Sequence, residues 1–158
     1  MAYINSAEAG KFVTLHISTA TIASTATTGM IVVSGLQNIT LNNGNSVFRW
    51  RQLDSTSESA VATAATNQIS MNIVIDDTDY FGDGAGDVTA EDKGLFKLSN
   101  DKNKVYFRLY YAGTASGGKY VSGSGYFTGL APTVSPDSPV WISPLTVEVD
   151  GDLTSGTV

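Results

Sequence analysis

Apolar and polar residues alternate in several short stretches of this chain, and a period of two predicts β-strands with one buried face. Residues 12–18 begin the series, with Leu15 and Ile17 on one face and His16 on the other. Residues 68–76 alternate most regularly, and their apolar positions are Ile69, Met71, Ile73 and Ile75. These stretches predict a sheet that buries one face against a core.

Two short strands are predicted at 30–34 and 37–41, separated at Gly35, where a bulge or turn costs little. The sequence Asn-Asn-Gly-Asn at 42–45 then predicts a turn, because Asn and Gly accept positive φ. Residues 18–29 are mostly Thr, Ala and Ser and predict a loop, since they offer little apolar surface to bury.

The next predicted strand, 46–53, carries Phe48 and Trp50 on one face and two arginines on the other, so one side is expected to pack. We expect this strand to pair with 68–76. Residues 54–67, between the two strands, are mostly Ser, Thr and Ala. Connections longer than about 12 residues are usually functional or disordered. Two interpretations therefore stay open: a surface loop, or an arm that becomes ordered on a neighbouring subunit.

Residues 104–112 and 119–128 predict a hairpin joined by a Gly-rich turn at 113–118. Both faces of its first strand are partly apolar, which indicates protein on both sides of it. One face carries Val105, Phe107, Leu109 and Tyr111, and the other carries Tyr106, Arg108 and Tyr110.

One helix is predicted at 89–98, where Thr89 can cap the first turn and Asp92 completes a capping box. Gly94 within this helix is expected to cost about 1 kcal/mol relative to alanine.

Three of the four prolines lie in 130–139, which predicts an extended linker. Residues 140–150 alternate again and predict the closing strand, in which Pro144 implies a kink or an edge position. Residues 151–158 are expected to form a C-terminal tail.

These elements predict a mainly β fold: a two-sheet antiparallel β-sandwich or barrel with one short flanking α-helix and a long hairpin loop. The length favours a single domain, 1–158, with a core of its own. The chain has no cysteine, which excludes disulfides and thiolate chemistry. It has no long apolar run and no signal-peptide pattern, so we expect no membrane partner and a place in the cytoplasm or in particles assembled there.

Candidate chemistry is sparse, and we predict no enzyme activity, no catalytic residue, no cofactor and no metal site. His16 is the sole histidine, it has no ligand partner at the usual spacing, and any hydrolytic triad would need it. The formal net charge of −6 disfavours binding of nucleic acid. The acidic segment 76–92 has carboxylates suited to Ca²⁺, but Phe81 and Val88 stand where an EF-hand needs ligands, so a solvated acidic loop is the competing interpretation.

The last third of the chain resembles phage major tail tube proteins. The likeness rests on Tyr120-Val-Ser-Gly-Ser-Gly-Tyr-Phe-Thr-Gly-Leu130, then the linker that ends in Ser-Pro-Asp-Ser-Pro139, then Leu145-Thr-Val-Glu-Val-Asp-Gly-Asp-Leu-Thr154. It covers about residues 104–154. The Thr/Ala-rich insertion at 18–29 and the short helix depart from the family pattern.

This resemblance implies a structural virion protein whose copies close into six-fold rings, and rings that stack into a tube through which the genome is delivered. Residues 54–67 would correspond to the loop that reaches an adjacent ring. The implied partners are further copies of the chain and other tail proteins (tape measure, terminator, baseplate and, in some tails, sheath). DNA would pass without sequence-specific binding, and assembly would take place in the host cytoplasm.

A second hypothesis also fits the residues: a β-sandwich binding module, such as a capsid decoration or carbohydrate-binding protein, with Trp50, Trp141 and the tyrosines as stacking platforms. A hydrolase that depends on His16 is a third hypothesis, which the sequence supports least.

Overall fold

The computed structural model describes residues 13–33, 36–84, 86–111, 113–137 and 139–158. Phe12, Ser34, Gly35 and Ala112, where the sequence predicts strand ends or a break, lie outside these ranges. The elements in chain order are β1 (Thr14–Ser18), β2 (Ile31–Val33), β3 (Leu36–Gly44), β4 (Val47–Trp50), β5 (Ser59–Ala62), β6 (Thr66–Val74), α2 (Asp77–Phe81), α3 (Ala90–Asn100), β7 (Val105–Tyr110), β8 (Lys119–Thr128), β9 (Ile142–Val149) and β10 (Thr154–Thr157).

The predicted fold class is confirmed: the described residues form a mainly β, antiparallel structure with short helices. Eight strands make one continuous sheet in the order β2-β1-β7-β8-β9-β6-β3, and β10 also pairs with β8. β4 and β5 make a separate two-stranded sheet. The end strands β2 and β3 do not pair with each other in the described residues, so the large sheet does not close into a barrel.

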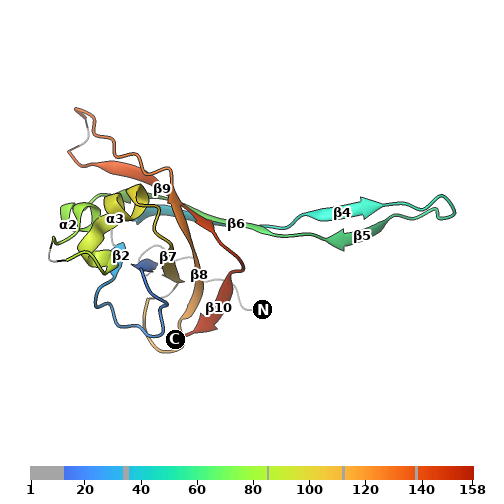
Figure 1. The fold of residues 1–158 in the computed structure, drawn as a ribbon, viewed down its shortest axis with the longest axis horizontal. Helices are drawn as coiled ribbons and strands as arrows, with labels where there is room; N and C mark the ends of the chain where they lie inside the picture. The colour runs from blue at the N-terminus through green and yellow to red at the C-terminus, as the bar shows by residue number, and fades with distance from the viewer. Residues whose placement is uncertain (1–12, 34–35, 85, 112, 138) are drawn as a thin grey trace.

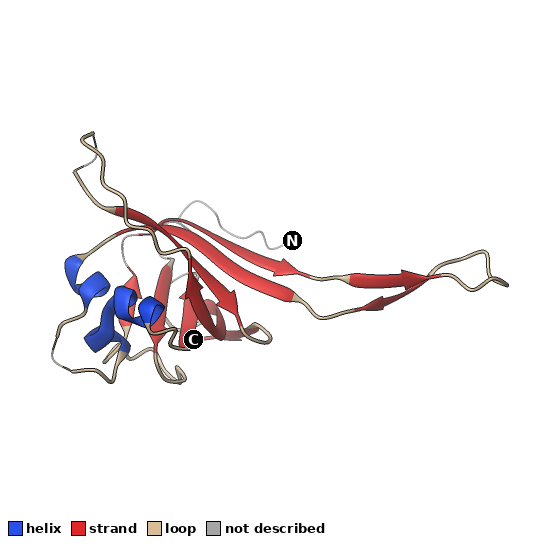
Figure 2. Ribbon diagram, turned by 45° about the horizontal axis from the view of Figure 1, so that its top comes forward, coloured by secondary structure: helices blue, strands red, loops and turns tan. Residues whose placement is uncertain are grey.

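The core lies between the large sheet and α3, as the predicted alternation requires (Figures 1 and 2). The apolar side chains of β1 and β6 belong to one buried cluster with Leu95 and Leu98 of the helix. The helix begins at the predicted cap: Thr89 Oγ1 accepts from the Asp92 amide, and the Asp92 carboxylate accepts from the Thr89 amide. The sequence thus predicted this helix and its capping box correctly.

β7 is buried on both faces, which confirms the interpretation of its two apolar faces. Phe107 and Leu109 belong to the core beneath α3. On the other face, Arg108 donates a hydrogen bond to the Ile22 carbonyl at 2.6 Å, and its guanidinium lies 4.1 Å from the centre of the Tyr120 ring. After Ser18, the last residue of β1, the polar segment up to residue 29 contains no strand, and the buried Ile22 joins it to the body.

The predicted pairing of 46–53 with 68–76 is wrong. β6 already has β3 on one side and β9 on the other, so neither of its edges is free for β4. β4 instead pairs with β5, which lies inside the segment 54–67. The predicted turn at 42–45 is also wrong, because β3 continues through Gly44 and pairs with β6 up to Thr66.

Near the C-terminus, β9 confirms the predicted closing strand and the local edge position of Pro144. Pro144 lies opposite Asn72 of β6, whose amide donates to Asn38 on the β3 side. The Pro144 nitrogen therefore points away from β6, to the other side of β9. β8 pairs with β9 only at residues 146–149, so that side of β9 is a local edge at Pro144. Residues 151–158, expected as a tail, contain β10, whose polar side chains gave no strand signal although its backbone pairs with β8.

Candidate functional site

A two-stranded arm, residues 45–65, extends from the body as a continuation of the β3–β6 hairpin (Figure 1). Every residue of β4 and β5 is exposed. The pairs Phe48↔Val61 and Trp50↔Ser59 place both aromatic rings on one face of the arm. Arg49 lies on the opposite face. The arm therefore has an aromatic face and a basic face, neither covered by the chain's own body.

The exposed apolar side chains of the arm are a feature that the fold of one copy does not explain. Phe48 is 59% exposed and stacks on Trp50 with ring centroids 6.0 Å apart, and Leu53 at the tip is fully exposed. An isolated two-stranded hairpin is marginally stable in water. Burying a side chain of this size contributes roughly 1.5–3 kcal/mol. Contact with a partner would therefore stabilise the arm.

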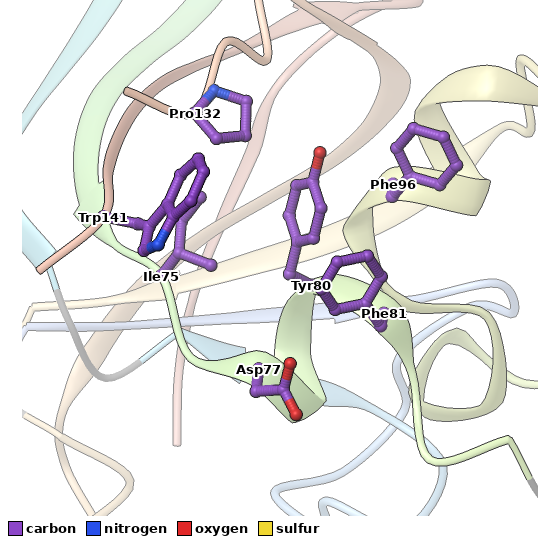
Figure 3. A pocket seen from close by; sticks show the side chains of 7 residues that line it. All are labelled: Ile75, Asp77, Tyr80, Phe81, Phe96, Pro132 and Trp141. Carbon is purple, nitrogen blue, oxygen red and sulfur yellow. The ribbon is translucent and has the colours of Figure 1, made fainter. Parts of the chain in front are cut away.

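A second exposed apolar surface, the aromatic groove, lies beside the two helices and has a volume of about 580 Å³. Figure 3 shows Trp141, Pro132 and Ile75 on one side of it and the three rings of the helices on the other, with Asp77 at its edge. Its apolar lining consists of Ile75, Tyr80, Phe81, Phe96, Pro132 and Trp141.

The groove is held by backbone contacts as well as by ring packing. The Tyr80 ring contacts the rings of Phe81 and Phe96, with centroids 4.8 Å and 5.8 Å apart. On the other side, the Ile75 amide donates to the Trp141 carbonyl at 2.9 Å. Phe81 remains 66% exposed and Trp141 52% exposed. The groove is thus preformed, apolar and open to solvent.

Two glycines bring α2 against α3 and so fix this arrangement. Gly82 and Gly94 both have positive φ, 82° and 69°. A Cβ at Gly94 would lie 2.4 Å from the Gly82 nitrogen, and a Cβ at Gly82 would lie 2.1 Å from the Asp92 carbonyl oxygen. The predicted view of Gly94 as a costly residue in a regular helix is therefore wrong: the backbone leaves the helical region there, and glycine is what allows it.

The acidic segment 76–92 folds largely around its own carboxylates. Asp76 caps α2 by accepting from the amides of Thr78 and Asp79, and Asp92 belongs to the capping box of α3. Asp87 forms a salt bridge with Lys97. In the described ranges, no group of three or more His, Asp or Glu side chains is arranged to hold a metal ion. The same ranges contain no helix with the length and apolar character needed to cross a membrane.

His16, the residue on which a hydrolytic site would depend, is buried in the sheet. Its ring packs against Tyr110 with centroids 4.8 Å apart, and it lies opposite Arg108 of β7. Burial, and then the Arg108 charge, hold the pKa of His16 below its ordinary value. Its Nδ1 atom has no hydrogen-bond partner among the described residues, whereas a catalytic triad needs a carboxylate there. This environment supports a structural role.

The two tryptophans proposed as stacking platforms do not form one surface. Trp50 belongs to β4 of the arm and Trp141 lines the aromatic groove beside α2 and α3. Figure 1 shows β4 and these helices at opposite ends of the molecule. Sequence reasoning missed Tyr80 and Phe81 as surface-forming residues, because they lie in a segment interpreted as an acidic loop. The signal that could have found them is Asp76 followed by Thr78 and Asp79, which is compatible with a capped first helical turn.

The chain matches no protein-family model and no curated protein sequence. Solved structures nevertheless contain chains of the same fold. A chain of the virion of a native gene transfer agent particle is 15% identical, with a TM-score of 0.65, and the match covers 93% of this chain and 97% of that chain. A chain of the tail of an empty gene transfer agent particle, refined helically with C6 symmetry, is 15% identical with a TM-score of 0.61, covering 89% and 93%.

Proposed function

We propose that this protein is a structural virion protein, the subunit of a phage-type tail tube. Its copies close into six-membered rings, and the rings stack into a conduit for genome delivery. The protein is assembled in the host cytoplasm and resides in the virion tail. It has no catalytic role.

The observation that carries this proposal is the uncovered arm on a fold shared with a chain of a C6-symmetric tail. The arm presents aromatic side chains that the body of one copy cannot cover. A second copy within reach of the arm would cover them. Two exposed apolar surfaces at different places on one chain favour repeated association, because a contact between unlike surfaces leaves one of each free for the next copy.

The end strands of the large sheet supply a way for rings to close. β2 and β3 each have one partner strand in the described residues, so each has an outer edge of backbone donors and acceptors. Pairing of such an edge with a neighbouring copy extends the sheet without new side-chain chemistry. Association through these edges, combined with the arm, gives contacts both around a ring and between rings.

The charge of the protein suits a conduit. With a formal net charge of −6, an assembled tube repels the phosphate backbone and lets DNA slide without sequence-specific contacts. Other tail proteins (tape measure, terminator, baseplate and, in a contractile tail, sheath) are the further partners of this role.

Electron microscopy of the purified chain tests this function directly. The expected result is tubes of stacked rings in negative stain, with sedimentation velocity showing species that grow with concentration. A chain that remains strictly monomeric at high concentration, with no rings or tubes in micrographs, overturns the proposal.

The aromatic groove favours one alternative function, a binding module of the capsid decoration or carbohydrate-binding class. Aromatic side chains beside an open groove are suited to stacking on sugar rings. A glycan-array or capsid-binding signal from the monomer, lost in Trp141→Ala, would support this alternative against the tail tube.

A further inference from the structure

The aromatic groove combines the faces of aromatic rings with a carboxylate. Trp141 lies on one side of it, Tyr80 and Phe81 lie on the other, and Asp77 lies at its edge (Figure 3). Trp141 and Phe81 are both more than half exposed. The groove has a volume of about 580 Å³, and sites for small molecules have volumes of about 300–1,000 Å³. The groove therefore has the size and the access that a small ligand needs.

The charge of the groove is negative. Of the described residues that line it, Asp77 alone is charged, and within the described ranges it takes part in no salt bridge. Burial, and then the charges of Asp76 and Glu91, raise the pKa of Asp79 on the same helix, so negative charge dominates beside the groove. The faces of aromatic rings also carry partial negative charge. The rings and the carboxylate thus favour the same kind of ligand, a cation.

These features select one class of cation. An anion is repelled by Asp77, and a neutral apolar ligand leaves that carboxylate without a partner. A primary ammonium is a compact charge that holds its water strongly. A quaternary ammonium group is positively charged and yet has methyl groups on its surface, so it can contact ring faces and a carboxylate together.

The groove is formed before any ligand binds. The close packing of α2 on α3 holds the rings of Tyr80 and Phe81 in contact, with centroids 4.8 Å apart. On the other side, the backbone of Trp141 is fixed by its hydrogen bond with Ile75. A preformed site loses little free energy to ordering when a ligand binds.

We propose that the aromatic groove binds a small organic cation of the quaternary ammonium class, with its methyl groups against Trp141 and Tyr80 and its charge facing Asp77. This site goes beyond the tail function and does not depend on it. A quaternary ammonium group can belong to free choline or to the headgroup of a choline lipid, and both present the same chemistry to the groove.

Calorimetric titration of the full chain with choline tests the site. The matched control ligand is the neutral alcohol in which a tert-butyl group replaces the trimethylammonium group of choline, because it has nearly the same shape and no charge. Choline is expected to bind, and the neutral alcohol is expected to bind about tenfold more weakly. Equal binding of the two overturns the proposal, since apolar burial alone would explain it. Absence of choline binding also overturns it.

Substitutions in the groove separate ring contact from apolar burial. Trp141→Leu keeps apolar surface but removes a ring face, so choline should bind about fivefold more weakly. Asp77→Asn removes the charge at nearly constant shape, and a loss of about threefold is expected. Tyr126→Leu is the matched control, because Tyr126 is an exposed aromatic residue that does not line the groove.

The control variant should bind choline as the parent does, and urea denaturation of all three variants checks that each is folded. Equal losses in Trp141→Leu and Tyr126→Leu overturn the proposal. So does a folded Asp77→Asn variant that binds the neutral alcohol and choline equally well while the parent does the same.

Flotation with phosphatidylcholine vesicles distinguishes the two sources of the cation. Flotation that Trp141→Leu abolishes assigns the site to the lipid headgroup, and choline binding without flotation assigns it to the free cation. Either result supports the site. Tubes in negative stain without choline binding overturn this proposal and leave the tail function standing, whereas choline binding without tubes supports the site and counts against the tail function.

Discussion

Gly94 shows how a single residue determines the shape of the aromatic groove. Its φ of 69° lets the chain turn within α3, and the missing Cβ leaves room for the Gly82 amide and the Tyr80 carbonyl. Gly94→Ala should therefore lower the free energy of unfolding by about 3 kcal/mol or more, since left-handed strain and a backbone clash act together. Urea denaturation measures this loss.

Gly84 offers the matched control for that substitution. It also has positive φ, 72°, but a Cβ there would meet nothing within 4 Å. Gly84→Ala should therefore cost about 1–2 kcal/mol, the strain alone. Equal losses at the two positions would contradict the close packing of α2 on α3.

His16 is expected to make stability depend on pH. Its pKa in the folded protein is lowered by burial and by Arg108, so the folded state binds fewer protons than the unfolded chain near and below pH 6.5. The free energy of unfolding should therefore fall as the pH drops through that value. Urea denaturation at neutral pH and at mildly acidic pH tests this, and His16→Phe, which keeps a ring beside Tyr110, should lose the dependence.

Asp79 is expected to change stability with pH in the opposite direction, and it provides a second comparison in this experiment. Burial, and then the charges of Asp76 and Glu91, raise the pKa of Asp79. As the pH is lowered, the folded protein therefore binds a proton at this group before the unfolded chain does. Lower pH therefore favours the folded state at this group. Asp79→Asn should therefore leave the loss of stability at mildly acidic pH in place, and a loss that survives His16→Phe would contradict the role given to His16.

At the scale of elements, the arm is separable from the body. β3 and β6 reach the arm at Gly44 opposite Thr66, so an Asn-Gly turn can replace residues 45–65 and close the hairpin there. Because the replaced strands are exposed, the free energy of unfolding should change by less than about 1 kcal/mol. Assembly should be lost. Urea denaturation and negative stain of the shortened chain measure the two effects, and tubes formed without the arm would contradict its proposed role.

The elements that bury apolar side chains could be predicted from the sequence, and those held by backbone pairing could not. β6 and β9 alternate regularly because Ile69, Met71, Leu145 and Val147 face the core. Apart from Val61, β5 and β10 consist of small or polar residues, so neither gives a period-two signal. The sequence Asn-Asn-Gly-Asn at 42–45 predicted a turn, yet the backbone stays extended up to Gly44 because it pairs with β6 there.

The surfaces of the whole molecule were harder to predict than its strands. The alternation in 46–53 correctly predicted that Phe48 and Trp50 share a face, but that face was expected to pack, since alternation alone does not distinguish a core from a partner. Trp141, Tyr80 and Phe96 come from three separate segments, and only the packing of α2, α3 and the linker brings them to one groove. A site assembled from distant segments leaves no local pattern to detect.

The net charge of the molecule leads to a prediction for the assembled protein. Because acidic residues outnumber basic residues by six, assembled tubes should retain no short fluorescent duplex DNA, even at about 50 mM salt, where phosphate contacts are stronger than at physiological salt. Co-sedimentation of tubes with the duplex measures retention, and the armless chain, which should not sediment, gives the background. Retention that weakens steeply with added salt would reveal clustered basic contacts on the tube and would contradict a conduit that lets DNA pass freely.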